Sequence, residues 1–253
     1  MKRCYLLSKK LWKLYSMKVF VIHAAKLVER GKHIKRMLDG LNLPFEFVKE
    51  ADADMLTEEI LDKYLIDGVA KMHHVGSHAS CTIKHLMVCE KIVSEHLDGA
   101  LVLEDDIVLH NNFLSIFQKS IVELREDYAN QPVIISYEDS SLQFVPRSKR
   151  KKGKVLYVGD NDRTAGAYYV SYEAAQAIVN DVNENRCQYP IDGYHNYLLH
   201  KGIIKYLWCH PTIASQGSFT GAFSSSLSHK NDMLIRLRWS LKKNYKTFLY
   251  WLR

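Results

Sequence analysis

Three consecutive acidic residues, Glu104, Asp105 and Asp106, follow the hydrophobic stretch 100–103. Adjacent carboxylates repel one another, so crowding them is costly unless a cation compensates their charge. Carboxylate oxygens are ligands that suit hard divalent ions such as Mg²⁺ and Mn²⁺, which keep positions open for phosphate oxygens. The pattern predicts a metal site facing a phosphate-bearing ligand, and the alternative is an acidic turn that leaves the strand. Apolar residues resume at 107–109, which argues against a simple solvated loop.

The rest of the sequence predicts the scaffold that positions this acidic cluster. Residues 17–23 are β-branched and aromatic, as in a buried strand. Residues 28–41 show helical spacing, and residues 45–48 alternate as a second strand. Further strands are expected at 100–103, 132–137, 155–158, 167–170 and 203–208. Further helices are expected at 58–65, 80–97, 112–128 and 173–182. A long loop is expected at 210–232. We therefore predict an α/β fold with a mostly parallel central sheet flanked by helices, whose ligands bind at the carboxyl ends of the strands.

Charge and cysteine content exclude several classes of protein. The 253 residues carry a net charge of +7, but residues 1–18, 147–154 and 233–253 each hold six Lys or Arg and no acid. The remaining 17 basic residues are outnumbered by 28 acidic ones, which is not the pattern of a nucleic-acid-binding protein, so we expect no nucleic-acid partner.

None of the five cysteines forms a CxxC pair, so the sequence supports neither a zinc site nor a disulfide framework. Without a long apolar run or a signal peptide, the expected location is the cytoplasm.

The sequence resembles the bacterial lipooligosaccharide glycosyltransferases of family 25, in particular the β-1,4-galactosyltransferases that extend the outer core. The resemblance spans roughly residues 17–230 and rests on the order of its elements, which are 19–23, Glu29-Arg30, Cys81 with His85, 103–106, 164–168 and 190–192. It implies a GT-A-like single domain and inverting transfer of galactose from UDP-galactose to a lipooligosaccharide sugar. The donor alternatives are UDP-glucose and a UDP-N-acetylhexosamine, and the alternative of another class is a non-catalytic membrane-surface binding protein.

The resemblance also implies roles for the acidic residues. Asp106 would bind Mn²⁺ or Mg²⁺ at the donor diphosphate, and Glu104 would share that task or hold the ribose. Asp105 belongs to the same donor-binding element. Asp192 is the candidate general base that deprotonates the acceptor hydroxyl. The alternative for Asp192 is the N-cap of a helix expected at 194–200.

Five further residues are candidates for donor or metal binding. Arg30 would pair with phosphate, unless it is an ordinary arginine on a helix surface. Thr164 and Gly166 lie in a segment of small residues that lets the backbone approach the donor sugar, or that serves tight strand packing. Gln216 would close over the diphosphate, and His210 would supply a third metal contact.

His85 is expected either to line the site or to pack in the core beside the apolar stripe of its helix. Two departures from the family pattern lie nearby. Lys84 stands where a serine is usual, and His23-Ala24 replaces Asn-Leu after the first strand. We expect base recognition to differ in detail because the first strand ends at the nucleotide pocket in this kind of fold.

Two basic segments flank the expected domain of residues 17–232. Residues 233–253 form a predicted amphipathic helix with six positive charges and two tryptophans, and Leu237, Leu241 and Tyr245 share its apolar face. This composition suits an anionic membrane surface and predicts a peripheral protein on the inner face of the inner membrane. The alternative is a helix docked on the domain. The extension 1–16 has the same basic character, and Met17 is an alternative start.

Overall fold

The computed structural model describes residues 17–66, 76–217 and 232–253, so the predicted extension 1–16 lies outside the described residues. Seven strands form one sheet in the order β2-β1-β3-β7-β5-β8-β6. The strands are β1 (Lys18–Ile22), β2 (Glu46–Val48), β3 (Gly99–Glu104), β5 (Val133–Ser136), β6 (Leu156–Val158), β7 (Ala167–Ser171) and β8 (Lys205–Cys209). Five of them run in the same direction, whereas β7 and β6 run antiparallel to their neighbours. The predicted α/β class is confirmed, with a mixed sheet.

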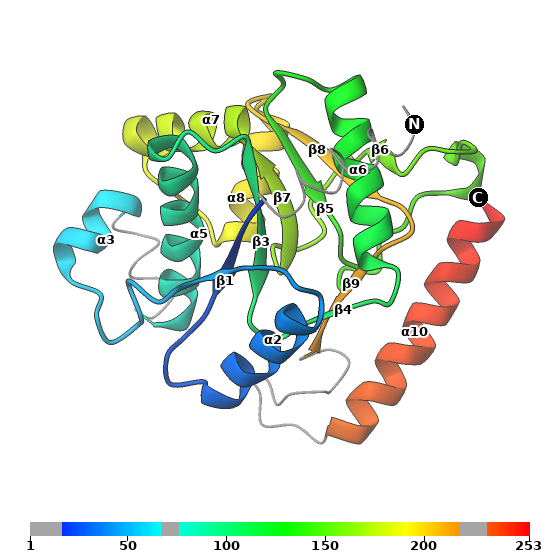
Figure 1. Ribbon diagram of the computed structural model, residues 1–253, viewed down its shortest axis with the longest axis horizontal. Helices are drawn as coiled ribbons and strands as arrows, with labels where there is room; N and C mark the ends of the chain where they lie inside the picture. The colour runs from blue at the N-terminus through cyan, green and yellow to red at the C-terminus, as the bar shows by residue number, and fades with distance from the viewer. Residues whose placement is uncertain (1–16, 67–75, 218–231) are drawn as a thin grey trace, which may run out of the picture.

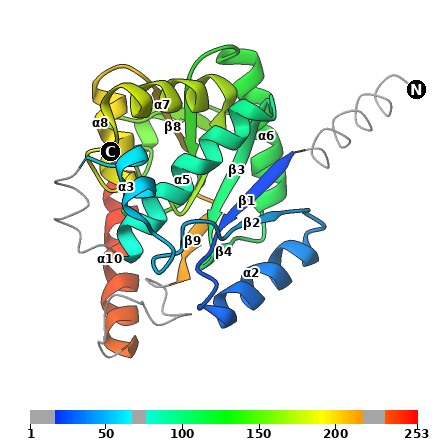
Figure 2. The same ribbon diagram turned by 90° about the vertical axis from the view of Figure 1, so that its left-hand side faces the viewer.

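Helices cover both faces of this sheet because its central strands are apolar on both sides. In β3, Ala100 and Val102 pack toward one core cluster, while Leu101 and Leu103 pack toward the other. The first cluster lies under α5 (Ser77–Ser94), α7 (Tyr172–Asn185) and α8 (Ile191–His200), and the second lies under α2 (Val28–Gly40) and α6 (Phe113–Asp127). Figures 1 and 2 show these two layers on opposite sides of the strands. A short helix, α3 (Glu58–Tyr64), packs beside α5.

A second, two-stranded sheet corrects the sequence-based expectation of a loop over 210–232. β4 (Ile107–Leu109) pairs antiparallel with β9 (Ala214–Gln216), so that Ile107 lies opposite Gln216. This pairing brings Gln216 next to the acidic residues that precede β4, although the two segments are far apart in the chain.

The C-terminal helix α10 (Asp232–Leu252) lies along the side of the domain (Figure 1) and packs against the segment around the short 3₁₀ helix η1 (Arg147–Lys149). Tyr250 packs edge-on against Phe144 with the ring centres 5.8 Å apart, and Lys243 lies 2.6 Å from the carboxylate of Asp139. The helix is therefore docked, as the alternative interpretation of the tail expects, yet several large apolar side chains on it remain exposed. No helix in the described ranges has the length and hydropathy that a membrane crossing requires.

Candidate active site

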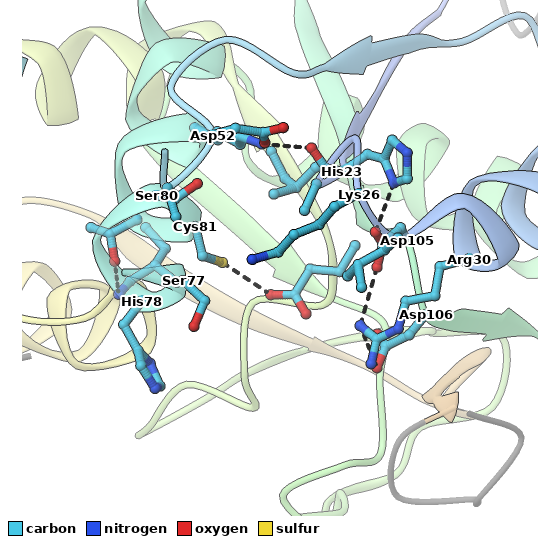
Figure 3. Close-up of a pocket in the computed structure, with 18 of the residues that line it drawn as sticks. His23, Lys26, Arg30, Asp52, Ser77, His78, Ser80, Cys81, Asp105 and Asp106 are labelled. Carbon is cyan, nitrogen blue, oxygen red and sulfur yellow. Dashed lines mark hydrogen bonds and ion pairs between the residues drawn. The ribbon is translucent and has the colours of Figure 1, made fainter. Parts of the chain in front are cut away.

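A cavity of about 420 Å³ opens where β1 and β3 end side by side. The two strands are parallel neighbours, and Ile22 of β1 is in register with Glu104 of β3, so the residues that follow both strands meet at one edge of the sheet. Figure 3 shows side chains from these strand ends and from α5 pointing into the cavity. Six of the residues predicted from the sequence line it: Arg30, Glu104, Asp105, Asp106, Asp192 and Gln216.

Asp105 is held by two basic side chains. Its carboxylate lies 2.8 Å from Nδ1 of His23 and 3.3 Å from the guanidinium of Arg30 (Figure 3). His23 follows β1 directly, and its ring packs on Phe47 with a centroid distance of 4.7 Å. His23 thus ties the acidic turn to the end of β1.

Glu104 contacts a thiol, an imidazole and an amide. Its carboxylate lies 3.7 Å from Sγ of Cys81, 3.6 Å from Nε2 of His85 and 3.4 Å from the amide of Gln216. Burial raises the pKa of this carboxyl group to about 8, and the negative charges of Asp106 and Asp105 act in the same direction.

Glu104 and Asp106 both line the cavity with carboxylate side chains. Asp106 is 4% exposed, and its carboxylate lies 3.8 Å from the guanidinium of Arg30. Burial, and after it the negative charges of Asp106 and Asp105, raises the pKa of Glu104, and a divalent cation would stabilise the charged form of its carboxylate. Both side chains supply the oxygen ligands that Mg²⁺ and Mn²⁺ prefer.

Asp192 reaches the cavity from α8. Pro190 occupies the N-cap of this helix, so Asp192 lies within the first turn and the N-cap alternative is wrong. Its carboxylate accepts a hydrogen bond of 2.8 Å from the backbone N–H of Ala165. Burial raises the pKa of Asp192 to about 7, and the charges of Glu104 and Asp162 contribute. A carboxylate with this pKa is suited to accept a proton near neutral pH.

Thr164 and Gly166 are not among the residues that line the cavity. Thr164 adopts a φ of 83°, in the left-handed region. The backbone N–H of Gly166 donates to Glu138 at 2.7 Å, and its carbonyl accepts from the backbone N–H of Glu104 at 2.8 Å. A Cβ at position 166 would lie 2.7 Å from the side-chain nitrogen of Gln216, so glycine gives Gln216 its place beside Glu104.

The two histidines of the sequence analysis lie in different places. His85 is fully buried below Glu104, and its Nδ1 lies 2.9 Å from the hydroxyl of Tyr168. Burial lowers the pKa of His85 to about 3, so its ring is neutral. His210 follows β8, packs against Tyr157 of the edge strand β6 and is not among the cavity residues. Its position disagrees with the assignment as a third metal ligand.

An ion pair in the wall of the cavity was not found by sequence reasoning. Lys84, which is 1% exposed, forms an ion pair with Asp52 and donates to the backbone carbonyl of His23 at 2.5 Å. Asp52 also accepts from the backbone N–H of Ala25 at 2.9 Å. The pair therefore fixes the loop after β1 to α5. Two sequence signals point to this ion pair: Lys84 stands where the resembled family has a serine, and Asp52 follows shortly after the predicted strand 45–48.

Two further functional candidates were also missed. Lys26 points into the cavity from the loop after β1 (Figure 3) and adds a positive charge to that of Arg30. Glu138, at the end of β5, is fully buried and accepts the N–H of Gly166. Burial raises the pKa of Glu138 to about 8. Like Glu104, it follows a hydrophobic strand, and this signal could have identified it.

Comparison with known proteins assigns the family. A family model described as Glycosyltransferase family 25 (LPS biosynthesis protein) matches residues 16–194. The lipooligosaccharide biosynthesis protein lic2B of Haemophilus influenzae is 25% identical over 168 residues, which are 63% of this chain and 61% of that protein. The chain thus spans less than two thirds of the length of this relative.

Among solved structures, the crystal structure of mannose-1-phosphate geranyltransferase from Thermus thermophilus is similar with a TM-score of 0.40 and 9% identity. The match covers 85% of this chain and 79% of that chain. A likeness this distant identifies no function. Because the family model matches more than half of the sequence, the chain belongs to glycosyltransferase family 25.

Proposed function

We propose that the chain is an inverting, metal-dependent hexosyltransferase that moves galactose from UDP-galactose to a sugar of lipooligosaccharide. One observation carries the proposal: a single cavity gathers Glu104, Asp106 and Arg30, which suit a metal-bound diphosphate, with Asp192, which suits a proton acceptor. The name of the H. influenzae relative supports a lipooligosaccharide acceptor.

In this mechanism Arg30 and Lys26 bind the negative diphosphate of the donor, and Gln216 and Gly166 hold Glu104 in place. Mn²⁺ or Mg²⁺ held by Glu104 and Asp106 would neutralise charge on the departing UDP. Asp192 takes the proton of the acceptor hydroxyl while that oxygen forms a bond to the anomeric carbon. The bond from this carbon to the UDP oxygen breaks with its electron pair, and attack from the opposite face inverts the configuration.

The exposed face of α10 supports a place at an anionic membrane surface. Leu237, Leu241, Tyr245 and Phe248 are 55–61% exposed and recur at helical spacing. The described basic residues nearby include Arg238, Lys242 and Lys246. An apolar stripe flanked by cations suits the headgroup layer of an anionic bilayer. We propose that α10 holds the enzyme on the inner face of the inner membrane, where a lipid-linked acceptor lies.

The catalytic proposal is tested by measuring UDP release from a panel of nucleotide sugars with a lipooligosaccharide acceptor, with and without Mn²⁺. We expect release with UDP-galactose and Mn²⁺. Preference for UDP-glucose or a UDP-N-acetylhexosamine would correct the donor, and full activity in chelator would overturn the metal assignment. Transfer from no donor, with membrane binding retained, would favour the non-catalytic alternative.

The membrane proposal is tested by cosedimentation with vesicles of anionic and of neutral lipid. We expect Leu241→Glu combined with Tyr245→Glu to abolish binding to anionic vesicles. The control is Val158→Glu, which places the same charge on an apolar residue that is 65% exposed on β6. Equal binding by both variants, or equal binding to neutral vesicles, would contradict the proposal.

A further inference from the structure

Three side chains of different chemistry converge at the cavity, where Cys81 and Glu104 line the wall and His85 is fully buried next to them. Cys81 and His85 are four residues apart on α5 and therefore share one face of the helix. Glu104 approaches them from the end of β3, and Figure 3 shows the sulfur of Cys81 pointing into the cavity. The three ligand atoms all lie within 4.8 Å of one another. A thiol, an imidazole and a carboxylate together form a set of metal ligands.

The imidazole of His85 carries an atom available for coordination. Its Nδ1 contacts the hydroxyl of Tyr168, and its Nε2 has no hydrogen-bond partner among the described residues although the residue is fully buried. Nε2 points toward Glu104 at 3.6 Å. When Nδ1 donates to Tyr168, the lone pair of Nε2 faces the cluster. Metal-binding histidines are oriented by this kind of hydrogen bond from the second ring nitrogen.

Two of the three distances between the ligand atoms suit a tetrahedral ion. With Zn–S of about 2.3 Å and Zn–N or Zn–O of about 2.0–2.2 Å, tetrahedral ligand atoms are separated by roughly 3.3–3.7 Å. The carboxylate of Glu104 lies 3.6 Å from Nε2 of His85 and 3.7 Å from Sγ of Cys81. We propose that Cys81, His85 and Glu104 bind Zn²⁺, with the fourth coordination position open to the cavity.

This ion differs in kind from the one at Glu104 and Asp106. A thiolate and an imidazole select Zn²⁺ or Co²⁺, whereas Mg²⁺ and Mn²⁺ prefer carboxylate oxygens alone. Binding releases the thiol proton of Cys81 to solvent. The inference does not depend on the proposed function. Because Glu104 belongs to both sets, we expect bound Zn²⁺ to inhibit transfer supported by Mn²⁺.

The test is titration of the chelator-treated full-length chain with Co²⁺ and then Zn²⁺, in the absence of any nucleotide sugar. We expect a thiolate-to-cobalt charge-transfer absorption that Zn²⁺ removes by displacement. Cys81→Ser abolishes this absorption. The matched control is Cys89→Ser, because Cys89 lies on the same helix but is 3% exposed in the core. Tyr168→Phe, which removes the partner of His85, weakens Zn²⁺ binding by about 10–100-fold.

Absence of the absorption in the wild-type chain, or its persistence in Cys81→Ser, would overturn the proposal. A measurement on the wild-type chain covers the case in which a variant fails to fold. Saturating Zn²⁺ is expected to slow the alkylation of Cys81 by iodoacetamide. The rate of alkylation is measured by mass spectrometry of the labelled peptide. An unchanged labelling rate would show that Zn²⁺ binds elsewhere and would also refute the site. Both results are independent of whether UDP is released in the transfer assay.

Discussion

Replacing Asp192 with asparagine should stabilise the fold while abolishing turnover. The folded-state pKa of Asp192 is about 7 against an ordinary value of 3.8, because the carboxylate is desolvated and faces Glu104. The folded state therefore binds more protons between pH 4 and pH 7, and stability falls as the pH rises through this range. Asparagine carries no charge, and its side-chain oxygen still accepts the hydrogen bond from Ala165. The variant therefore does not lose the folding stability that the wild type loses above pH 7, where the desolvated Asp192 carboxylate is charged.

The magnitude follows from the two pKa values. Their difference corresponds to at most about 4 kcal/mol, at 1.36 kcal/mol per pKa unit. Because the side chain of Asp192 is only partly buried and solvent screens its neighbours, we expect about 2 kcal/mol. For a chain of this size that is a rise in Tm of roughly 4–8 °C at pH 8, and close to none at pH 4.

The assay is thermal and urea unfolding of wild type and Asp192→Asn at pH 4, 6 and 8 in chelator, together with UDP release at pH 8. We expect turnover to fall by about 10²–10⁴-fold, as for the loss of a general base, with UDP binding retained. The control is Asp160→Asn, which removes an exposed charge and should change stability by less than about 0.5 kcal/mol. Destabilisation of Asp192→Asn at pH 8, or full turnover, would refute the reasoning.

Three other substitutions probe the rest of the site. Asp106→Asn should lower Mn²⁺-dependent UDP release by at least about 10²-fold and weaken Mn²⁺ binding measured by calorimetry; unchanged Mn²⁺ binding would remove Asp106 from the metal site. Lys84→Met leaves Asp52 buried without its partner and should lower the free energy of unfolding by about 3–5 kcal/mol, whereas the double variant with Asp52→Asn should recover part of this loss. Failure to recover would show that the Lys84 contact with the His23 carbonyl dominates. Gly166→Ala should displace the side-chain amide of Gln216 and lower turnover at a small stability cost, because the new Cβ meets the ends of flexible side chains, and wild-type turnover would show that Gln216 is dispensable.

The sequence predicted much of the scaffold because burial patterns are local. Alternating or continuous apolar runs identified β1, β3, β5 and β7, since each strand must bury side chains on one or both faces. The short strand β9 was missed because three residues carry too little periodicity, and it forms only through pairing with β4. The antiparallel direction of β7 within the sheet likewise depends on strand order, which no local pattern specifies.

The sequence alone determined that three acids follow a buried strand and that a basic, amphipathic helix ends the chain, because both are properties of neighbouring residues. Tertiary structure alone decided which side chains contact the three acidic residues. His23 reaches Asp105 across 82 positions of the chain, and Gln216 reaches Glu104 across 112. The same holds for the raised pKa values of Glu104 and Asp192. A pKa depends on desolvation and on charges within a few ångströms, and these are set only when distant segments pack at one edge of the sheet.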